Sequence, residues 1–250
     1  MTLRALIFDV DGTLAETEET HRQAFNETFA KRGLPWSWTA DNYRRLLEVT
    51  GGKERIRHFI ATQNPPGGPD AISAIPALHA EKTIRYAELI DAGAAAARPG
   101  VVRLVQEARA EGLKVAIATT TSQPNVVAIL RAMFGPDGES LFDVIGAGDV
   151  VPRKKPAPDI FQWTLRRLNL SPAEAIALED SANGVQAALG AGIAVVTTPS
   201  LYSIGQDFTG SLAVLSDLGE PDRPYRHLAG TGAESGWVTP AALRYWLAAA

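Results

Sequence analysis

Two aspartates, Asp9 and Asp11, stand one residue apart directly after the apolar run Leu3–Phe8. Such a run predicts a buried strand, and a carboxylate at its end is costly to bury without a partner. A second acidic pair, Glu179 and Asp180, follows another apolar run. Crowded carboxylates raise one another's pKa, and a hard cation with oxygen ligands relieves their repulsion. The four acids therefore predict a Mg²⁺ site, although the Asp-Gly step alone would also fit a plain turn.

A hydroxyl group and a lysine come at comparable points of the chain. Thr119 opens the sequence TTTS directly after the run Leu113–Ala118, and Lys154 and Lys155 lie in PRKKPAPDIF just before a predicted helix. A threonine can donate a hydrogen bond to an anion, and a lysine can neutralise one. Each also has a plainer interpretation, since Thr119 could cap the next helix and the two lysines could be solvated in a loop.

The elements that must position these side chains alternate along the chain. Short apolar runs predict buried strands at Leu3–Phe8, Leu113–Ala118, Phe142–Ala147, Ala175–Leu178 and Ile193–Thr197. Helical patterns lie at Val101–Ala110, Asn125–Met133, Pro158–Leu168 and Asn183–Ala191. This alternation predicts an α/β fold with a doubly wound parallel sheet. Because ligands bind outside the carboxyl ends of such strands, we expect Asp9, Thr119, Glu179 and Asp180 at one rim.

Residues 16–97 break the alternation and predict an inserted α-helical cap domain, while residues 1–15 and 98–250 form the core. The cap helices are expected at Thr17–Arg32, Thr39–Val49, Lys53–Gln63 and Pro69–Asp91. The small flanking segments Gly12–Ala15 and Ala92–Arg98 can act as hinges. Near the end of the chain, Ser216–Gly236 is rich in Gly, Pro and charge and predicts a surface excursion, and a terminal helix is expected to start at Pro240.

The composition limits the possible partners and compartments. The net charge of −4 argues against a nucleic acid as partner, since phosphate backbones require a basic face. The chain has no apolar stretch near the roughly 20 residues of a membrane span. A strand pattern begins almost at the first residue, which leaves no room for a signal peptide. With no cysteine, disulfides and thiolate chemistry are excluded. We expect a cytoplasmic protein, a monomer, that binds neither membranes nor nucleic acids.

The four groups, in the order DVDG, TTTS, PRKKPAPDIF and ALEDSANG, resemble the four motifs of the haloacid dehalogenase-like superfamily over essentially the whole chain. The resemblance implies a Rossmann-like core in which Asp9 is the nucleophile that forms an aspartyl-phosphate. It implies that Asp11 protonates the leaving oxygen and later takes a proton from water. Thr119 would donate to a phosphoryl oxygen, and Lys155, which directly precedes PAPD, would neutralise charge. The implied Mg²⁺ ligands are Asp9, Asp11 through its backbone carbonyl, Glu179 and Asp180.

The expected cap contains a local excess of positive charge. The sequence YRRLLEVTGGKERIRH, from Tyr43 to His58, has five Lys and Arg residues against two acids, although the whole chain is negative. Gly51 and Gly52 precede a predicted helix there, and the free N–H groups of a helix start attract anions. This segment is either a solvated basic face or a clamp for a second phosphate, and Lys53 and Arg55 are the residues best placed to form the clamp.

Within the superfamily the layout resembles the branch of β-phosphoglucomutases and CbbY-type phosphatases. That resemblance implies a Mg²⁺-dependent phosphatase for a small sugar phosphate or bisphosphate, such as xylulose-1,5-bisphosphate, an inhibitor of the Calvin-cycle enzyme Rubisco. A phosphosugar mutase, a phosphatase for a small monophosphate such as phosphoglycolate, and a non-catalytic binding protein are the alternatives. The expected substrate-binding residues are Glu18, His21, Arg44, Lys53, Arg55, Lys82, Thr120 and Ser122. Of these, His21 could equally be a core histidine and Lys82 a solvated lysine.

Overall fold

The structure, a computed structural model, describes residues 2–232 and 235–249. Residues 233–234 of the expected excursion and residue 250 of the expected terminal helix lie outside the described residues. Within the described chain, no helix is both long enough and apolar enough to cross a membrane.

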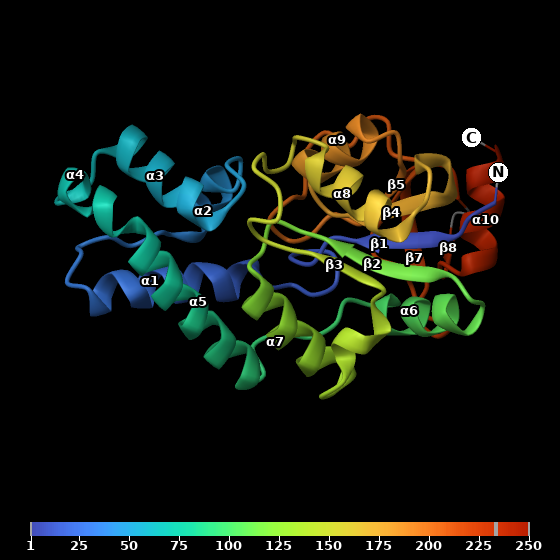
Figure 1. The fold of residues 1–250 in the computed structure, drawn as a ribbon, viewed down its shortest axis with the longest axis horizontal. Helices are drawn as coiled ribbons and strands as arrows, with labels where there is room; N and C mark the ends of the chain where they lie inside the picture. The colour runs from blue at the N-terminus through green and yellow to red at the C-terminus, as the bar shows by residue number, and fades with distance from the viewer. Residues whose placement is uncertain (1, 233–234, 250) are drawn as a thin grey trace.

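One sheet crosses the core in the order β3-β2-β1-β4-β5-β6-β7-β8, counted over the described residues (Figure 1). Its strands are β1 Ala5–Phe8, β2 Lys114–Ala118, β3 Val144–Gly146, β4 Ala175–Glu179, β5 Ala194–Thr197, β6 Ala213–Leu215, β7 Tyr225–Gly230 and β8 Ser235–Gly236. Strands β1 to β6 are parallel, and β7 and β8 pair antiparallel at one edge. Phe8 at the end of β1 pairs with Ile117 of β2 and Leu178 of β4. The predicted doubly wound α/β fold is therefore confirmed, and three strand ends meet at one rim.

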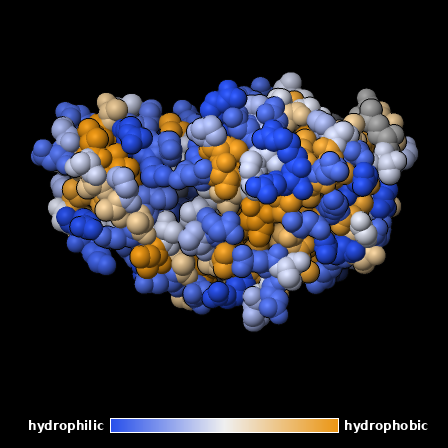
Figure 2. All heavy atoms as spheres, in the orientation of Figure 1, coloured by the Kyte–Doolittle hydropathy of each residue, from blue (hydrophilic) through white to orange (hydrophobic). Residues whose placement is uncertain are grey.

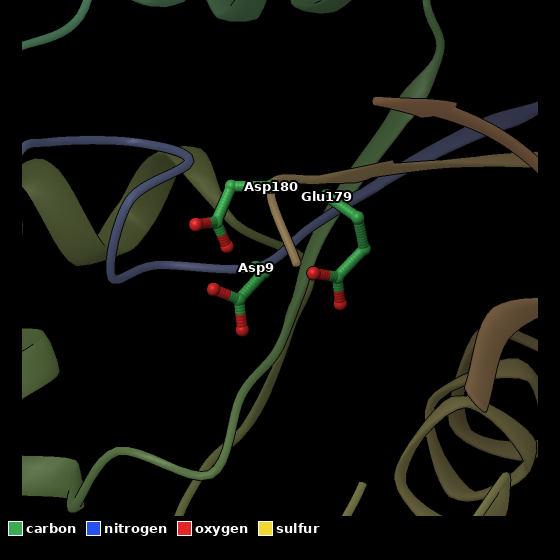
Figure 3. Close-up of side chains that lie close together, drawn as sticks. All are labelled: Asp9, Glu179 and Asp180. Atoms are coloured by element: carbon green, nitrogen blue, oxygen red, sulfur yellow. The ribbon is translucent and has the colours of Figure 1, made fainter. Parts of the chain in front are cut away.

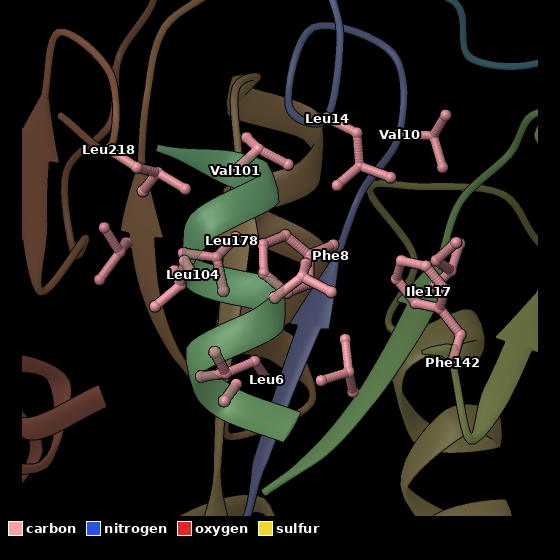
Figure 4. Close-up of a cluster of buried hydrophobic side chains, with 14 of the residues drawn as sticks. Leu6, Phe8, Val10, Leu14, Val101, Leu104, Ile117, Phe142, Leu178 and Leu218 are labelled. Carbon is pink, nitrogen blue, oxygen red and sulfur yellow. The ribbon is translucent and has the colours of Figure 1, made fainter. Parts of the chain in front are cut away.

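Helices cover both faces of this sheet. Its flanking helices are α6 Val101–Ala110, α7 Gln123–Phe134, α8 Asp159–Leu168, α9 Ala182–Gly190 and α10 Pro240–Ala249, with short 3₁₀ turns at Gly138–Leu141 and Pro172–Glu174. Leu6 and Phe8 pack with α6, α7 and α10, and Figure 4 shows both beside Leu104 of α6. Ala5 and Ile7 face the opposite layer of α8 and α9. Successive side chains of a strand point to opposite faces, so a strand covered on both sides is continuously apolar.

A separate group of helices lies beyond the carboxyl ends of the strands, at the left of Figure 1. It consists of α1 Glu18–Lys31, α2 Ala40–Leu46, α3 Gly52–Gln63, α4 Gly68–Ala71, a 3₁₀ turn Ile72–Ala74 and α5 Ile75–Asp91. These helices, which we call the helical unit, have a hydrophobic cluster of their own that includes Phe25, Phe29 and Trp38. The expected single helix Pro69–Asp91 is wrong, because the chain forms two helices joined by a turn. Pro69 and Pro76 each stand in the first turn of a helix, where the missing N–H is tolerated.

The last part of the core also differs from the sequence-based expectation. The segment Ser216–Gly236 is more than a surface excursion, because its strand β7 pairs with β6 and extends the sheet. Most residues of β7, which lies between β6 and the edge strand β8, are exposed, and the segment therefore lacks the apolar run that revealed the central strands. The expected terminal helix is present as α10, which starts at Pro240.

Candidate active site

A cleft of about 530 Å³ lies between the helical unit and the strand ends of the core. Figure 2 shows the surface hollowed between these two parts, with hydrophilic residues around the hollow. Asp9 and Asp11 reach the cleft from the end of β1, Thr119 from the end of β2, and Asp180 from the end of β4. Parallel strands in register bring these residues together although they are far apart in the sequence.

Three carboxyl groups converge on the core side of the cleft. Oxygen atoms of Asp9, Glu179 and Asp180 all lie within 4.8 Å of one another, and Figure 3 shows the three side chains turned to a common space. We call them the acidic cluster. The Nζ atom of Lys155 lies 2.6 Å from Asp9 Oδ1 and 2.5 Å from Glu179 Oε1, so it bridges two of the three acids. All four side chains are buried.

Burial and mutual repulsion determine the electrostatics of the acidic cluster. Burial raises the pKa of Asp9, against the opposing effect of Lys155. Burial, with repulsion from Asp9 and Asp180, raises the pKa of Glu179 to about 8. Burial and the charge of Asp9 raise the pKa of Asp180 to about 7. Burial alone would lower the pKa of Lys155, but its two carboxylate partners raise it above the ordinary value. One lysine therefore faces three acids, and the cluster lacks positive charge.

The donor set fits a divalent cation. Carboxylate oxygens are the ligands that Mg²⁺ prefers. Glu179 Oε2 is buried and has no hydrogen-bond partner among the described residues, which is rare for a buried carboxylate oxygen. Gly184 at the start of α9 leaves room for this carboxyl group, because a Cβ atom at that position would overlap it. Within the described chain, the cluster thus has one unpartnered carboxylate oxygen and three acids against a single lysine, two properties that a bound cation would correct.

The carboxyl group of Asp11 belongs to a different environment. It accepts hydrogen bonds from Thr17 and Thr121, and its Oδ1 lies 2.9 Å from His21 Nε2. Burial lowers the pKa of His21 to about 4, so the neutral ring donates from Nε2 while Lys82 contacts Nδ1. Burial acts to raise the pKa of Asp11, but His21 and the two hydroxyls outweigh it and hold that pKa well below its usual value. The pKa values of Asp9 and Asp11, which lie in one turn, are therefore shifted in opposite directions.

The remaining predicted core residues occupy the same side of the cleft. Thr119 is buried, its N–H donates to Gly146 at the end of β3, and Thr120 and Ser122 line the cleft beside it. The lysine next to the acidic cluster is Lys155, as expected, whereas the Nζ atom of Lys154 lies 2.7 Å from Asp149 Oδ1. The two adjacent lysines therefore have different partners.

Arg55 and Glu18 form a buried network on the helical side of the cleft. The guanidinium of Arg55 donates to Tyr43 Oη at 3.0 Å and to the backbone carbonyl of Leu46 at 3.2 Å. Tyr43 in turn donates to Glu18 at 2.9 Å. Burial raises the pKa of Glu18 to about 7, against the opposing charge of Arg55. Both charged side chains line the cleft, as expected.

The two other basic cap residues differ in position. Arg44 is exposed and lines the cleft, where it donates to the carbonyl of Leu201 and lies over the ring of Tyr202. Lys53 lies outside the cleft lining, and its ammonium group pairs with Asp149 at 2.6 Å. The expected clamp of Lys53 and Arg55 is therefore corrected: Arg55 faces the cleft, and Lys53 joins the helical unit to the core.

Several residues at the cleft had no role in the sequence-based prediction. Thr17 and Thr121 hold Asp11, and only Thr121, inside TTTS, lay in a motif that could have revealed it. Asn125 is buried at the cleft with no partner for its Oδ1 among the described residues. Tyr43 and Tyr202 also contact cleft residues. Nothing in the spacing of these two tyrosines marks them, because their contacts depend on tertiary packing.

Comparison with known proteins places this geometry in a family. Residues 3–192 match the family model of haloacid dehalogenase-like hydrolases. The CbbY protein of Cereibacter sphaeroides is 49% identical over 218 residues, which cover 87% of this chain and 94% of that protein. The plasmid CbbY protein of Cupriavidus necator is 47% identical over 247 residues, which cover 98% of this chain and 96% of that protein.

A solved structure agrees with these relatives. The crystal structure of a mutant of CbbY from Rhodobacter sphaeroides in complex with xylulose-(1,5)bisphosphate matches with a TM-score of 0.83 and 47% sequence identity. The match covers 88% of this chain and 96% of that one. Both the core and the helical unit therefore share their arrangement with that structure.

Proposed function

Because the chain belongs to the haloacid dehalogenase-like hydrolase family, we propose that it is a Mg²⁺-dependent phosphatase for a small sugar bisphosphate, namely xylulose-1,5-bisphosphate. The charge of the cleft carries this proposal, since cationic side chains line both of its ends. Lys155 lies beside the acidic cluster, and Arg44, Arg45 and Arg55 line the helical side. A short molecule with a phosphate at each end complements this pattern, whereas a monophosphate leaves one end unmatched.

The likeness to CbbY supports the same substrate. The crystallised CbbY mutant is described in complex with xylulose-(1,5)bisphosphate, and it covers nearly the same length of chain. In this proposal residues 16–97 form the specificity cap, and residues 1–15 and 98–250 form the catalytic core. The cap then binds the phosphate that stays on the sugar, while the core acts on the phosphate that leaves.

The core residues have complementary roles in the proposed reaction. The Asp9 carboxylate attacks phosphorus and forms an aspartyl-phosphate while the sugar oxygen leaves. Lys155 and Thr119 stabilise the negative charge of the transferring group. Mg²⁺, held by Asp9, Glu179, Asp180 and the carbonyl of Asp11, would supply further charge neutralisation when bound.

Asp11 is the proposed proton carrier of the reaction. Its lowered pKa keeps it ionised at neutral pH, which is the form that takes a proton from the attacking water. The negative charge of a bound phosphate raises the pKa of a neighbouring acid, which favours the protonated form needed to protonate the leaving oxygen. His21 would hold the Asp11 carboxyl in place during both steps.

The test is release of inorganic phosphate, with Mg²⁺, from xylulose-1,5-bisphosphate and from xylulose 5-phosphate, with Asp9→Asn as the blank. We expect the bisphosphate to have a kcat/KM higher by at least ~10²-fold, which corresponds to about 2.7 kcal/mol. Equal values, or a higher value for the monophosphate, would refute the bisphosphate assignment. An isomerised sugar phosphate in place of inorganic phosphate would identify a mutase.

Two substitutions in the helical unit test the proposed second-phosphate contacts. Arg44→Ala removes a cation that lines the cleft and should lower kcat/KM for the bisphosphate about tenfold while leaving the monophosphate nearly unaffected. Arg57→Ala removes an exposed cation of α3 that lies outside the cleft lining, and it serves as the matched control. Similar effects of both substitutions would mean that only the general charge of the helical unit matters.

A further inference from the structure

The segment that follows β5, residues 198–206, contacts both the helical unit and the acidic cluster. We call it the β5 loop. Ser200, Tyr202, Ser203 and Gln206 of this loop line the cleft. The loop belongs to the core in sequence, yet Tyr202 packs in the hydrophobic cluster of the helical unit. It therefore joins two parts of the molecule that the chain connects elsewhere through residues 12–17 and 92–98.

Tyr202 makes the contact with the helical unit. Its side chain is buried, and its ring packs edge-on against the ring of Tyr43, with centroids 5.7 Å apart. The hydroxyl donates to Glu19 Oε2 of α1 at 2.6 Å. The carbonyl of the preceding Leu201 accepts a hydrogen bond from Arg44 of α2. Two helices of the helical unit are thus attached to two adjacent residues of the β5 loop.

Ser203, the next residue, makes the contact with the acidic cluster. Its Oγ accepts a hydrogen bond from the N–H of Ser200 at 2.8 Å, which leaves the hydroxyl hydrogen for an acceptor. Asp180 Oδ2 lies 3.1 Å away and accepts it, and Ser200, whose Oγ lies 3.0 Å from Ser203 Oγ, is a second serine that hydrogen-bonds Asp180. Hydrogen bonds to a carboxylate favour its charged form and fix its direction. Ser203 therefore influences the one carboxyl group of the cluster that Lys155 does not contact.

Arg98 holds the base of the β5 loop. The buried guanidinium of Arg98 donates to the carbonyls of Thr198 at 2.6 Å and Pro199 at 2.9 Å, and also to the carbonyl of Gly12. This cation ties the loop base to the turn that carries Asp9 and Asp11. A displacement of Tyr202 must therefore be absorbed within the next few residues, which include Ser203.

We propose that Tyr202 is a positioning residue that couples docking of the helical unit to the orientation of the Asp180 carboxyl group through Ser203. The inference rests on the proposed function, because it assigns Asp180 to the Mg²⁺ site. When the helical unit is docked, the buried ring and its hydroxyl bond to Glu19 together hold Ser203 against Asp180. When the helical unit moves away, Tyr202 loses its pocket and Ser203 loses its fixed position. Metal affinity then depends on contacts made by the helical unit, although that unit supplies none of the proposed ligands.

The first test is the affinity for Mg²⁺, measured by titration calorimetry without substrate on the wild type, Tyr202→Ala, Ser203→Ala and the double variant. We expect each single substitution to weaken Mg²⁺ binding about tenfold and the double variant to be no weaker than the single ones. Unchanged Mg²⁺ affinity in Tyr202→Ala, or effects that multiply in the double variant, would overturn the coupling. Tyr245→Ala, which removes an exposed ring from α10, is the control.

Two further measurements keep the result interpretable. Tyr202→Phe keeps the packed ring and loses the hydroxyl that contacts Glu19 and Arg22, so a folded protein is available if Tyr202→Ala does not fold. We expect Tyr202→Phe to lose Mg²⁺ affinity roughly threefold. If Tyr202→Ala does not fold, an unchanged Mg²⁺ affinity in Tyr202→Phe overturns the proposal. In the Tyr202 variants at saturating Mg²⁺, we expect the KM for the sugar phosphate to rise by a larger factor than kcat falls. Because calorimetry needs no substrate, failure of the phosphatase assignment appears only in phosphate release and remains distinct from failure of the coupling.

Discussion

Gly12, the glycine of DVDG, is a position where one added methyl group should disturb the acidic cluster. Its backbone has a φ of +81°, in the left-handed region. A Cβ atom there would lie 2.7 Å from Asp180 Cγ and 2.9 Å from Ser200 Cβ, well inside van der Waals contact. Gly12→Ala must therefore push the Asp180 carboxyl group and the β5 loop away from the turn that holds Asp9.

The expected loss of folding stability in Gly12→Ala has two parts. A non-glycine residue in the left-handed region costs about 1–2 kcal/mol. Overpacking a well-packed site costs typically another ~1–3 kcal/mol. Gly112 has a φ of +74° and open space around it, so Gly112→Ala carries only the first part. We expect Gly12→Ala to lower the free energy of unfolding by about 2–5 kcal/mol and Gly112→Ala by about 1–2 kcal/mol.

The assay is urea denaturation of both variants in EDTA, together with Mg²⁺ titration calorimetry. Gly12→Ala should also weaken Mg²⁺ binding at least tenfold, because it displaces a proposed ligand, whereas Gly112→Ala should bind Mg²⁺ as the wild type does. If both variants lose the same stability and keep the same Mg²⁺ affinity, then the close packing of Gly12 against Asp180 has no energetic consequence, and our account of this turn is refuted.

Three further predictions concern charge. Lys155→Met leaves Asp9 and Glu179 buried without their cation, and in EDTA urea denaturation should show a loss of about 3–5 kcal/mol; a loss below about 1 kcal/mol would contradict the buried bridge. Burial raises the pKa of Glu18 from 4.5 to about 7 in the folded protein. The unfolded chain therefore loses the Glu18 proton at a lower pH than the folded protein does. The free energy of unfolding should fall by about 3 kcal/mol as the pH rises from 4.5 to about 7. Glu18→Gln should remove this part of the pH dependence, as seen by urea denaturation at pH 4.5 and 7.5, and an unchanged slope would count against it. Mg²⁺ at ~100 times its Kd should stabilise the wild type by about 2.7 kcal/mol in thermal unfolding, and Asp180→Ala should lose most of that gain unless the cation binds elsewhere.

Much of the core was readable in the sequence because its signals are local. A strand covered by helices on both faces must be apolar at every position, so runs such as Ala5–Phe8 are visible without any structure. Once a parallel sheet is inferred, its carboxyl ends must share one rim, and Asp9, Thr119 and Asp180 are brought together by topology alone. Strand β7, next to the edge strand β8, escaped detection for the same reason, since a mostly exposed strand has no apolar run.

Side-chain direction was decided by the tertiary structure. Asp9 and Asp11 are separated by a single residue, yet one carboxyl group joins the acidic cluster and the other turns to His21 of α1. Lys53 and Arg55 differ in the same way, since Asp149 of the core draws Lys53 out of the cleft lining. Spacing along one helix cannot reveal a partner that lies on another element.

The residues that hold the site together also divide into those that the sequence reveals and those that only tertiary contacts reveal. The motif sequences determined which chemical groups the protein has and the rim at which they meet, because those properties follow from residue type and strand order. Tyr202 and Arg98 each contact a residue far away in the sequence: Tyr202 bonds Glu19, and Arg98 bonds Thr198. No local pattern encodes such contacts. The contact of Tyr202 exists only once the helical unit packs against the core, and that of Arg98 only once the core itself has folded, which is why the folded structure alone reveals them.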